Sequence, residues 1–402
     1  MNRHRIAAAI IVVAVVAVVA WTWWTAPSRG VEHVTASSPF VAEEVPDSVP
    51  GALTEIWAVD APKSSAPFTV DGLALAADDH GVTAVNPSTG DTVWSYHRDV
   101  ELCEAMVSDG RVVAVFRGPA GCGEVTSLNA ADGTYAATRR GLSTDEVEPV
   151  RSNDRSGIRD GSMVELWRHD LVRTVEYGDV EASSEPGLQP HPGCDVVDAL
   201  TRGDVLAVVN DCPDGHRLVL QAATPEESRS PEIDADIELP GPGRLVALGQ
   251  LAAAVLVDGE VRTYSMEGAP GPTWTPREGE LPQETDEAAS LDDGPVPVAA
   301  TADLPHHMTW FTGSALAAFR PDDLSLAFVV PNALGTGTVV GDELLVPVPG
   351  GLTRVDWETG EITGVVPVAR GALAEGETVT TAVAGDVIVE KRGDRLVGLR
   401  PE

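Results

Sequence analysis

Residues 70–96 read VDGLALAADDHGVTAVNPSTGDTVWSY, and this stretch decides the fold that we expect for the chain. It holds two short apolar runs, then an Asn-Pro-Ser-Thr-Gly-Asp turn, then a run that includes Trp94. Short apolar runs bounded by Gly, Asp, Asn and Pro are typical of antiparallel strands. The stretch therefore predicts consecutive strands of one small sheet.

Weaker copies of this unit recur as far as the C-terminus. Each copy has a turn that contains glycine, then an apolar strand, and usually a second turn and another strand. The first turns are Asp71-Gly72, Asp109-Gly110, Asp160-Gly161, Gly203-Asp204, Gly249-Gln250, Gly313-Ser314, Gly341-Asp342 and Gly385-Asp386. A repeated unit of about 40 to 50 residues marks a propeller. The sequence therefore predicts an all-β propeller rather than a fold with helices.

The last unit, residues 384–401, lacks an outer strand, while residues 53–60 form an orphan strand that contains Trp57. Pairing the two would close the ring and remove the unpaired edges that an open ring leaves. We therefore predict a propeller domain over residues 53–402, with eight blades favoured. Seven blades remain the alternative, with the acidic, loop-like residues 263–305 as an insertion.

The chain begins with a basic head, residues 1–5, and a long apolar run, residues 6–25. About 20 uncharged residues are enough to cross a hydrocarbon core of roughly 30 Å. Arg3 and Arg5 precede the run, so the positive-inside rule places the head in the cytoplasm. We predict an uncleaved transmembrane helix over residues 6–25, with a cleaved signal peptide as the alternative.

Residues 26–52 are rich in Pro, Ser, Glu and Val and show no clean period. They are predicted to form an extracytoplasmic tether between the membrane and the ring. The expected location is the cell membrane, with a single span and with the propeller outside the cytoplasm.

The charge of the chain is lopsided, with 62 acidic residues against 27 basic ones and a net charge of −35. Only Lys63 and Lys391 are lysines. Such a field repels nucleic acid and anionic lipid, so no nucleic-acid partner is expected. The acidity is typical of a soluble surface, and it would also attract cations or a basic protein partner.

Four cysteines form two similar brackets, Cys103 with Cys122 and Cys194 with Cys212. Each bracket encloses one turn and one strand of the repeat. We predict two disulfides with this pairing, as an exported domain permits. Each would stabilise the fold by roughly 3 kcal/mol in the chain-entropy model. A zinc site is the rival interpretation, but Cys-x2-Cys spacing is absent.

Residues 84–94 resemble the tryptophan-docking turn of PQQ-like, or quinoprotein-type, β-propeller repeats. The pattern of that turn is roughly Ala-x-Asp-x-x-Thr-Gly-x-x-x-Trp. Asn86 stands at the Asp position, and Thr89, Gly90 and Trp94 match. The Thr-Gly pair supplies a tight reversal, and the Trp is expected to pack between neighbouring sheets.

The resemblance extends over most of residues 53–402 but is specific in only two or three units. Residues 355–360, which end in Thr359 and Gly360, match the first half of the pattern, and residues 128–133 are a degenerate copy. Trp57 and Trp274 are expected to have the same packing role as the Trp of the best copy.

Some members of this family are PQQ-dependent dehydrogenases, and their likeness implies an adjacent Cys-Cys disulfide and a calcium site. Neither is recognisable here. Other members resemble the membrane-anchored scaffold of the outer-membrane protein assembly machine, which binds partners and performs no chemistry. The resemblance to that class is closer in size and anchoring, although this chain carries a helix in place of a lipid.

No residue pattern predicts catalysis, a cofactor or a metal. The nucleophile elbow Gly-x-Ser-x-Gly and the Walker loop are both missing from the sequence. His306 and His307 are expected to be solvated loop residues. Asp211 and Asp214, like residues 292–294, are expected to serve turns rather than to bind calcium.

The function expected from these observations is a non-enzymatic interaction scaffold of the bacterial cell envelope, with an envelope or membrane protein of unknown identity as its partner. The alternatives are a PQQ-dependent oxidoreductase and a sensor of a small ligand or cation.

Overall fold

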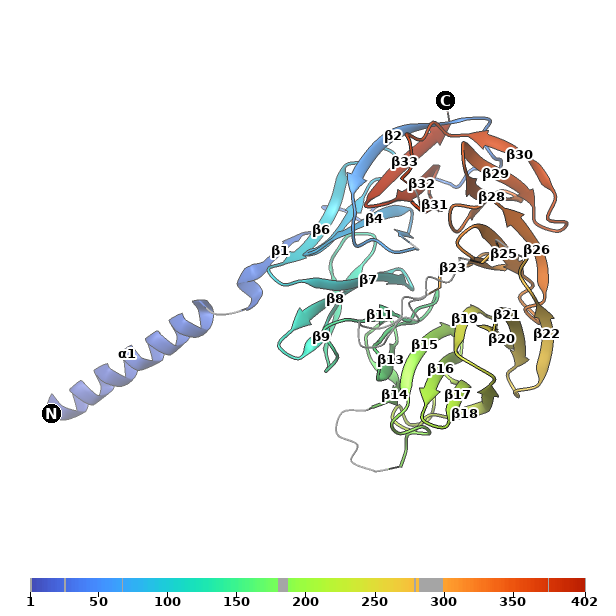
Figure 1. The fold of residues 1–402 in the computed structure, drawn as a ribbon. Coiled ribbons are helices and arrows are strands. Elements are labelled where there is room, and N and C mark those ends of the chain that lie inside the picture. The colour runs from blue at the N-terminus through green and yellow to red at the C-terminus, as the bar shows by residue number, and fades with distance from the viewer. Residues whose placement is uncertain are drawn as a thin grey trace.

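The computed structural model describes residues 2–24, 27–66, 68–179, 187–277, 280–281, 299–374 and 376–401. Within them, an N-terminal helix, α1 (Asn2–Trp24), projects from a ring of eight antiparallel sheets (Figure 1). The prediction of an eight-bladed propeller is confirmed, and the seven-blade alternative is excluded.

The first four blades follow the chain. Blade 1 contains β3 (Thr69–Val70), β4 (Leu73–Asp78), β5 (Gly81–Val85) and β6 (Thr92–Arg98). Blade 2 contains β7 (Leu102–Ser108), β8 (Arg111–Gly118), β9 (Gly121–Asn129) and β10 (Tyr135–Arg140). Blade 3 contains β11 (Glu148–Pro149), β12 (Ser156–Arg159), β13 (Met163–Trp167) and β14 (Arg173–Gly178). Blade 4 contains β15 (Asp195–Arg202), β16 (Val205–Cys212), β17 (Gly215–Ala222) and β18 (Ile233–Leu239).

The other four blades complete the ring. Blade 5 contains β19 (Gly243–Leu248), β20 (Ala252–Val257), β21 (Glu260–Ser265) and β22 (Pro270–Trp274). Blade 6 contains β23 (Thr301–Asp303), β24 (Met308–Phe311), β25 (Ala315–Phe319) and β26 (Leu326–Pro331). Blade 7 contains β27 (Thr338–Val340), β28 (Glu343–Val348), β29 (Gly351–Asp356) and β30 (Ile362–Pro367). Blade 8 contains β31 (Val379–Ala384), β32 (Val387–Arg392), β33 (Arg395–Pro401) and β2 (Leu53–Asp60).

The ring is closed by its own N-terminus, as the orphan strand predicts. β2 pairs antiparallel with β33, from Leu53 opposite Pro401 to Asp60 opposite Arg395. Blade 8 thereby gains the outer strand that its own stretch of sequence lacks. The region considered as an insertion, residues 263–305, contains β22 and β23, which belong to blades 5 and 6. Residues 282–298 of it lie outside the described residues.

Each sheet packs on both of its faces, which explains why the strands are continuous apolar runs. On β17, Leu218 and Leu220 join one hydrophobic cluster, and Val219 between them joins another. Successive side chains of a strand point to opposite faces, so a blade between two neighbours needs apolar residues at both.

The predicted tether is packed against the ring from its fifth residue onward. After the short helix η1 (Pro27–Gly30), β1 (Val31–Val34) pairs with β6 as a fifth strand of blade 1. The amide of Phe40 then donates to the carbonyl of Ala131 in blade 2, at 2.8 Å. Further on, this segment contacts turn glycines of blades 1, 8 and 7, namely Gly72, Gly385 and Gly341, before it enters β2.

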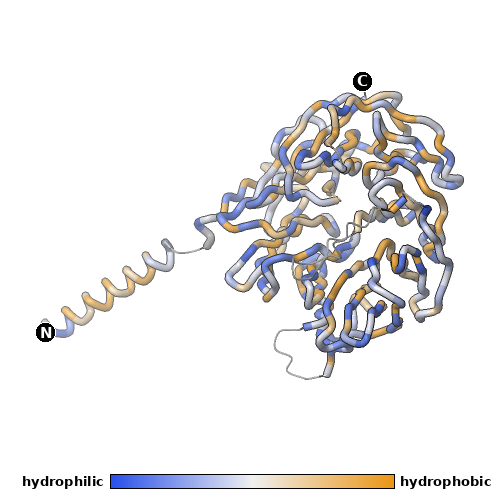
Figure 2. The backbone as a smooth tube through the Cα atoms, in the orientation of Figure 1, coloured by the Kyte–Doolittle hydropathy of each residue, from blue (hydrophilic) through white to orange (hydrophobic). Residues whose placement is uncertain are grey.

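α1 is long and apolar enough to cross a membrane, either as an anchor or as a signal sequence. Its apolar side chains are exposed, and Figure 2 shows the hydrophobic colour along the helix. Both predicted cysteine pairs lie at disulfide distance, with Cα atoms 6.0 Å apart for Cys103 and Cys122 and 4.3 Å apart for Cys194 and Cys212. Disulfides are typical of oxidising compartments, which suggests a ring outside the cytoplasm.

Candidate functional site

The residues that carry the repeat pattern form docking turns between blades. The amide of Gly90 donates to the Asn86 carbonyl at 2.8 Å, and Gly90 has φ of 80°. A Cβ on Gly90 would lie 2.7 Å from Cβ of Trp57 in blade 8. The indole of Trp57 donates to the Pro87 carbonyl at 2.5 Å, and the Thr89 hydroxyl accepts from the Asp91 amide at 3.2 Å. This turn therefore seats the Trp of the preceding blade.

The same docking arrangement occurs between other blades of the propeller, with other aromatic side chains. Trp94 of blade 1 donates to the Ala130 carbonyl of blade 2 at 2.7 Å and packs over Gly133. In blade 7 the turn that ends in Thr359 and Gly360 seats Phe328 of blade 6, whose Cγ would lie 2.5 Å from a Cβ on Gly360. These repeat residues therefore pack the blades together.

The adjacent histidines belong to the same kind of interface. The His306 ring stacks on Trp357 with ring centres 3.8 Å apart. His307 is only 8% exposed and lies edge-on to Phe328. Its burial, followed by the nearby His306 and Arg320, lowers its pKa. The prediction of a solvated loop residue is wrong for His307, because Phe328 of blade 6 and Trp357 of blade 7 lie against it.

A central channel with charged side chains in its wall runs between the blades. Its volume is about 630 Å³, and the innermost strands or loops of all eight blades line it. Threonine recurs around the wall, at positions 69, 201, 301, 336, 338, 378, 380 and 381. Charge enters at a few positions, which are Glu104, Glu148, Arg151, Arg202, Asp303 and Lys391.

Glu104 of β7 is a carboxylate whose pKa departs strongly from its usual value. Burial raises its pKa to about 7, and Glu148 adds to the effect, while the Ala105 amide, Ser65 and Arg151 oppose it. The Ala105 amide donates to Oε1 at 2.8 Å, and the Ser65 hydroxyl donates to the same oxygen at 3.3 Å. Glu104 is half-buried. Its side chain lines the channel, and the surrounding protein covers the rest of it.

Arg151 lies on the same part of the wall, in the turn between β11 and β12. Burial lowers its pKa to about 10, although Glu104 opposes this. Within the part of the chain that the structure describes, Arg151 makes no hydrogen bond or ion pair. It therefore presents a guanidinium group with five donors to the channel.

A second charged group spans the channel wall. Nε and Nη2 of Arg202 on β15 donate to both carboxylate oxygens of Asp303 on β23, at 2.8 and 2.9 Å. These strands belong to blades 4 and 6, so the pair bridges across blade 5. Lys391 lies elsewhere on the wall, where its ammonium group donates to the Gly393 carbonyl. Burial lowers the pKa of Lys391.

Asp198 of β15 is a carboxylate of a different kind, because neighbouring blades enclose it. It is fully buried and lies 3.6 Å from Arg159 of blade 3, which is also fully buried. Its other oxygen accepts from Arg244 of blade 5 at 3.2 Å and from the Leu245 amide at 3.0 Å. Asp198 thus ties three blades together.

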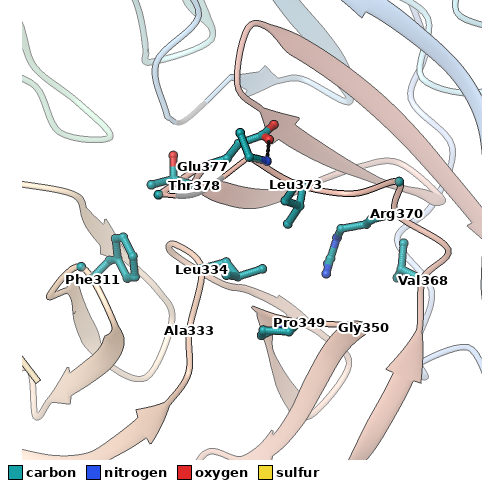
Figure 3. A pocket seen from close by; sticks show the side chains of 14 residues that line it. Phe311, Ala333, Leu334, Pro349, Gly350, Val368, Arg370, Leu373, Glu377 and Thr378 are labelled. Atoms are coloured by element: carbon teal, nitrogen blue, oxygen red, sulfur yellow. Dashed lines mark hydrogen bonds between the residues drawn. The ribbon is translucent and has the colours of Figure 1, made fainter. Parts of the chain in front are cut away.

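A smaller cleft of about 490 Å³ lies between blades 6, 7 and 8 (Figure 3). Arg370 points into it, with Leu334 and Pro349 nearby. Nε and Nη2 of Arg370 donate to Glu390 at 2.9 and 2.6 Å, and Nη1 donates to the Val348 carbonyl at 2.7 Å. Because these bonds occupy the guanidinium group, the cleft is a poorer anion site than the channel.

Sequence reasoning missed the charged residues of the channel. A signal was present for one of them: Glu104 stands five residues before Asp109-Gly110, the turn that follows its strand, and Asp198, which is buried between blades, stands at the same distance before Gly203-Asp204. The periodic pattern placed them in strands, but only the closed ring shows which of them face the axis.

The described residues do not fit the quinone cofactor of the PQQ-dependent enzymes. The expected adjacent Cys-Cys disulfide is absent, since the two disulfides join residues 19 and 18 positions apart. The channel wall offers charged groups that are spread over several blades rather than a clustered set of acidic and amide ligands.

Comparison with known proteins supports the fold alone. No family model and no curated protein sequence matches the chain. The structure is similar to Sqt1 of Saccharomyces cerevisiae, with 12% identity and a TM-score of 0.51, over 91% of this chain and 100% of that one. It is also similar to apo AztD from Citrobacter koseri, with 14% identity and a TM-score of 0.49, over 82% and 94% of the two chains. The dihydro-heme d1 dehydrogenase NirN is similar with 12% identity and a TM-score of 0.48, over 86% of this chain and 78% of NirN.

Proposed function

We propose that the protein is a membrane-anchored scaffold whose ring binds a protein partner outside the cytoplasm and performs no chemistry. The observation that carries this proposal is the junction between the helix and the ring. α1 ends at Trp24, η1 begins at Pro27, and from β1 onward the chain is packed against the blades. A ring joined so closely to a membrane span stays at the membrane surface, where it can present one face to a neighbour.

The two faces of the ring differ in what covers them. Turns between the first and second strands of each blade lie on one face, and residues 36–50 cross that face. Connections between blades and turns between second and third strands lie on the opposite face, called the loop face here. Asp79, Asp145 and Asp214 on the loop face have side chains 70%, 76% and 71% exposed. We propose that this face binds a basic protein surface.

Site-specific photo-crosslinking in native membranes tests the scaffold. A photoreactive residue at Leu142, 46% exposed in the loop between β10 and β11, lies on the loop face. Leu251, 62% exposed in the turn between β19 and β20, is the matched control on the other face. We expect one specific adduct at Leu142 that weakens as salt is raised. An adduct only at Leu251 would overturn the assignment of the face, and no adduct at either position would overturn the scaffold.

A second candidate function is favoured by Arg151. A guanidinium group that lines a cavity and has no hydrogen-bond or ion-pair partner among the described residues is suited to a planar anion such as a carboxylate. We propose that the channel binds a small organic carboxylate, so that the ring would act as a ligand sensor. Glu104, with a pKa of about 7, would accept a hydrogen bond from a donor group of the same ligand at neutral pH.

Thermal shift measurements distinguish this second function from the first. Amino acids, short dicarboxylates and calcium are added separately to the detergent-solubilised protein. The carboxylates are expected to raise the melting temperature of the native chain and to leave Arg151→Met unchanged. A shift with calcium alone would indicate a cation site, and equal shifts in both proteins would exclude Arg151 from the binding site.

A further inference from the structure

The corner of blade 4 around the Cys194–Cys212 disulfide contains a third potential metal ligand. One ring nitrogen of His191 and the sulfur atoms of Cys194 and Cys212 all lie within 4.8 Å of one another. The carboxylate of Asp236 on β18 lies next to the histidine, with its Oδ2 3.1 Å from Nε2 of His191, and it is not part of the 4.8 Å cluster. Thiolate sulfur, imidazole nitrogen and carboxylate oxygen are each ligand atoms that zinc binds in proteins.

The contact between His191 and Asp236 has the spacing of two metal ligands rather than the alignment of a hydrogen bond. Nε2 of His191 is buried and forms no hydrogen bond in the described structure, although the carboxylate is so near. Around a tetrahedral zinc with bonds of about 2.0–2.1 Å, neighbouring nitrogen and oxygen ligands lie about 3.3 Å apart. The observed separation is close to that value.

The local sequence holds two of these residues in a metal-binding turn. His191-Pro-Gly-Cys194 has His-x2-Cys spacing, and the Cys194 amide donates to the His191 carbonyl at 3.3 Å. Gly193 has φ of 82°, which the tight turn requires and which glycine adopts at little cost. Nη1 of Arg217 donates to Oδ1 of Asp236 at 3.3 Å, and Oδ2 is the oxygen that lies near His191.

We propose that reduction of the Cys194–Cys212 disulfide creates a zinc site, with Cys194, Cys212, His191 and Asp236 as its ligands. While the disulfide is intact, its sulfurs are bonded to each other and cannot act as thiolates. A dithiol reductant supplies two electrons and two protons, becomes a disulfide itself and leaves two cysteine thiols. Binding of Zn²⁺ then releases both thiol protons to solvent, so that the ion takes the place of the lost cross-link.

The other disulfide is a natural control, because it lacks such neighbours. Cys122 Sγ lies 3.0 Å from the carbonyl oxygen of Asp145. Among the described residues, no histidine or carboxylate completes a ligand cluster with Cys103 and Cys122. Reduction of this pair therefore frees two thiols without forming a site.

The test uses the full chain in detergent micelles, reduced with dithiothreitol that is then removed under argon. Co²⁺ serves as a spectroscopic probe, and Zn²⁺ affinity is measured by competition with a chelator. We expect one equivalent of metal, with thiolate-to-cobalt absorption, in the reduced native chain and none before reduction. Cys103→Ser/Cys122→Ser should bind as the native chain does, whereas Cys194→Ser/Cys212→Ser should not bind. His191→Ala and Asp236→Asn should each bind at least tenfold more weakly.

If reduction destabilises the ring, the melting temperature with and without Zn²⁺ provides a second measurement of metal binding. In the Cys103→Ser/Cys122→Ser variant, only the proposed site remains to be reduced. If the reduced variant is destabilised, stoichiometric Zn²⁺ should restore its melting temperature, because binding to the native form is linked to folding. Absence of both metal binding and restoration would overturn the proposal. Full binding by Cys194→Ser/Cys212→Ser would do so too.

Discussion

Glu104 in blade 2 and Asp198 in blade 4 occupy the same place in their strands but have opposite surroundings. Each directly follows the bulge of an inner strand, and each accepts a hydrogen bond from the amide of the next residue, Ala105 or Ala199. Asp198 lies between two arginines with no exposure to solvent, whereas Glu104 faces the channel with a hydroxyl as its side-chain partner. The repeat thus sets where a carboxylate lies, and the neighbouring blades decide whether it cross-links them or titrates near neutral pH.

Removing the charge from Asp198 should have the largest effect. Asp198→Asn removes the carboxylate that compensates the buried charge of Arg159 most, ahead of Glu148 and Asp160, and breaking such a buried pair costs about 3–5 kcal/mol. We expect a clear fall in the melting temperature and faster amide hydrogen exchange in blades 3 to 5. Asp195→Asn, an exposed site on the same strand, is the matched control and should change stability by about 0.5 kcal/mol or less. Equal effects at the two sites would contradict the structural role of Asp198.

Glu104→Gln should have the opposite sign and should depend on pH. A folded-state pKa of about 7, above the value of 4.5 for an unperturbed Glu, means that folding disfavours the ionised form. Below pH 4.5 the Glu104 carboxyl is neutral in both the folded and the unfolded chain, and the native protein keeps its full stability. As the pH rises through 7, ionisation favours the unfolded chain, and this part of the free energy of unfolding is lost. The variant should therefore match the native chain at pH 4 and exceed its stability by about 2 kcal/mol at pH 8, allowing for water in the channel.

Denaturant titrations of both proteins across this pH range measure the difference. A gap between the two proteins that is independent of pH would contradict the raised pKa of Glu104. An equivalent titration of Asp198→Asn should retain the native pH dependence in this range, because Glu104 remains in place.

The smallest effects should come from the charges around Glu104. Arg151 lowers its pKa and Glu148 raises it, and both contribute less than burial does. Arg151→Met should therefore move the midpoint of the pH-dependent stability upward and Glu148→Gln should move it downward, each by less than about one pH unit. Comparison of each variant with its double mutant carrying Glu104→Gln isolates the contribution of Glu104. Shifts in the same direction would exclude these charges as the cause.

The features that the sequence predicts well depend on local patterns. Apolar runs between glycine turns indicate blades, and Trp57 with the orphan strand at 53–60 indicates closure of the ring. The turn at Thr89 and Gly90 indicates a docking site because its shape follows from a few neighbouring residues. The cysteine brackets similarly follow from two units that share a spacing.

Local patterns could not predict which residues share the channel wall, because these residues meet only after eight blades have assembled. Arg202 and Asp303 are 101 positions apart, and nothing in either strand shows that they will pair. The predicted tether also looked unstructured from composition, yet Phe40 and Ala42 find contacts on blades 2 and 1. Its binding partners are turns of distant units, which no local period reveals.

The pairing of β2 with β33 also has a consequence during synthesis of the chain, because the two strands are made at very different times. Leu53 emerges from the ribosome roughly 350 residues before its partner Pro401. At about 5–20 residues per second, β2 waits on the order of 20–70 s with its pairing edge exposed. If α1 enters the membrane during this interval, it holds that waiting strand at one place while the blades form in order. β33 therefore completes the sheet that β2 began.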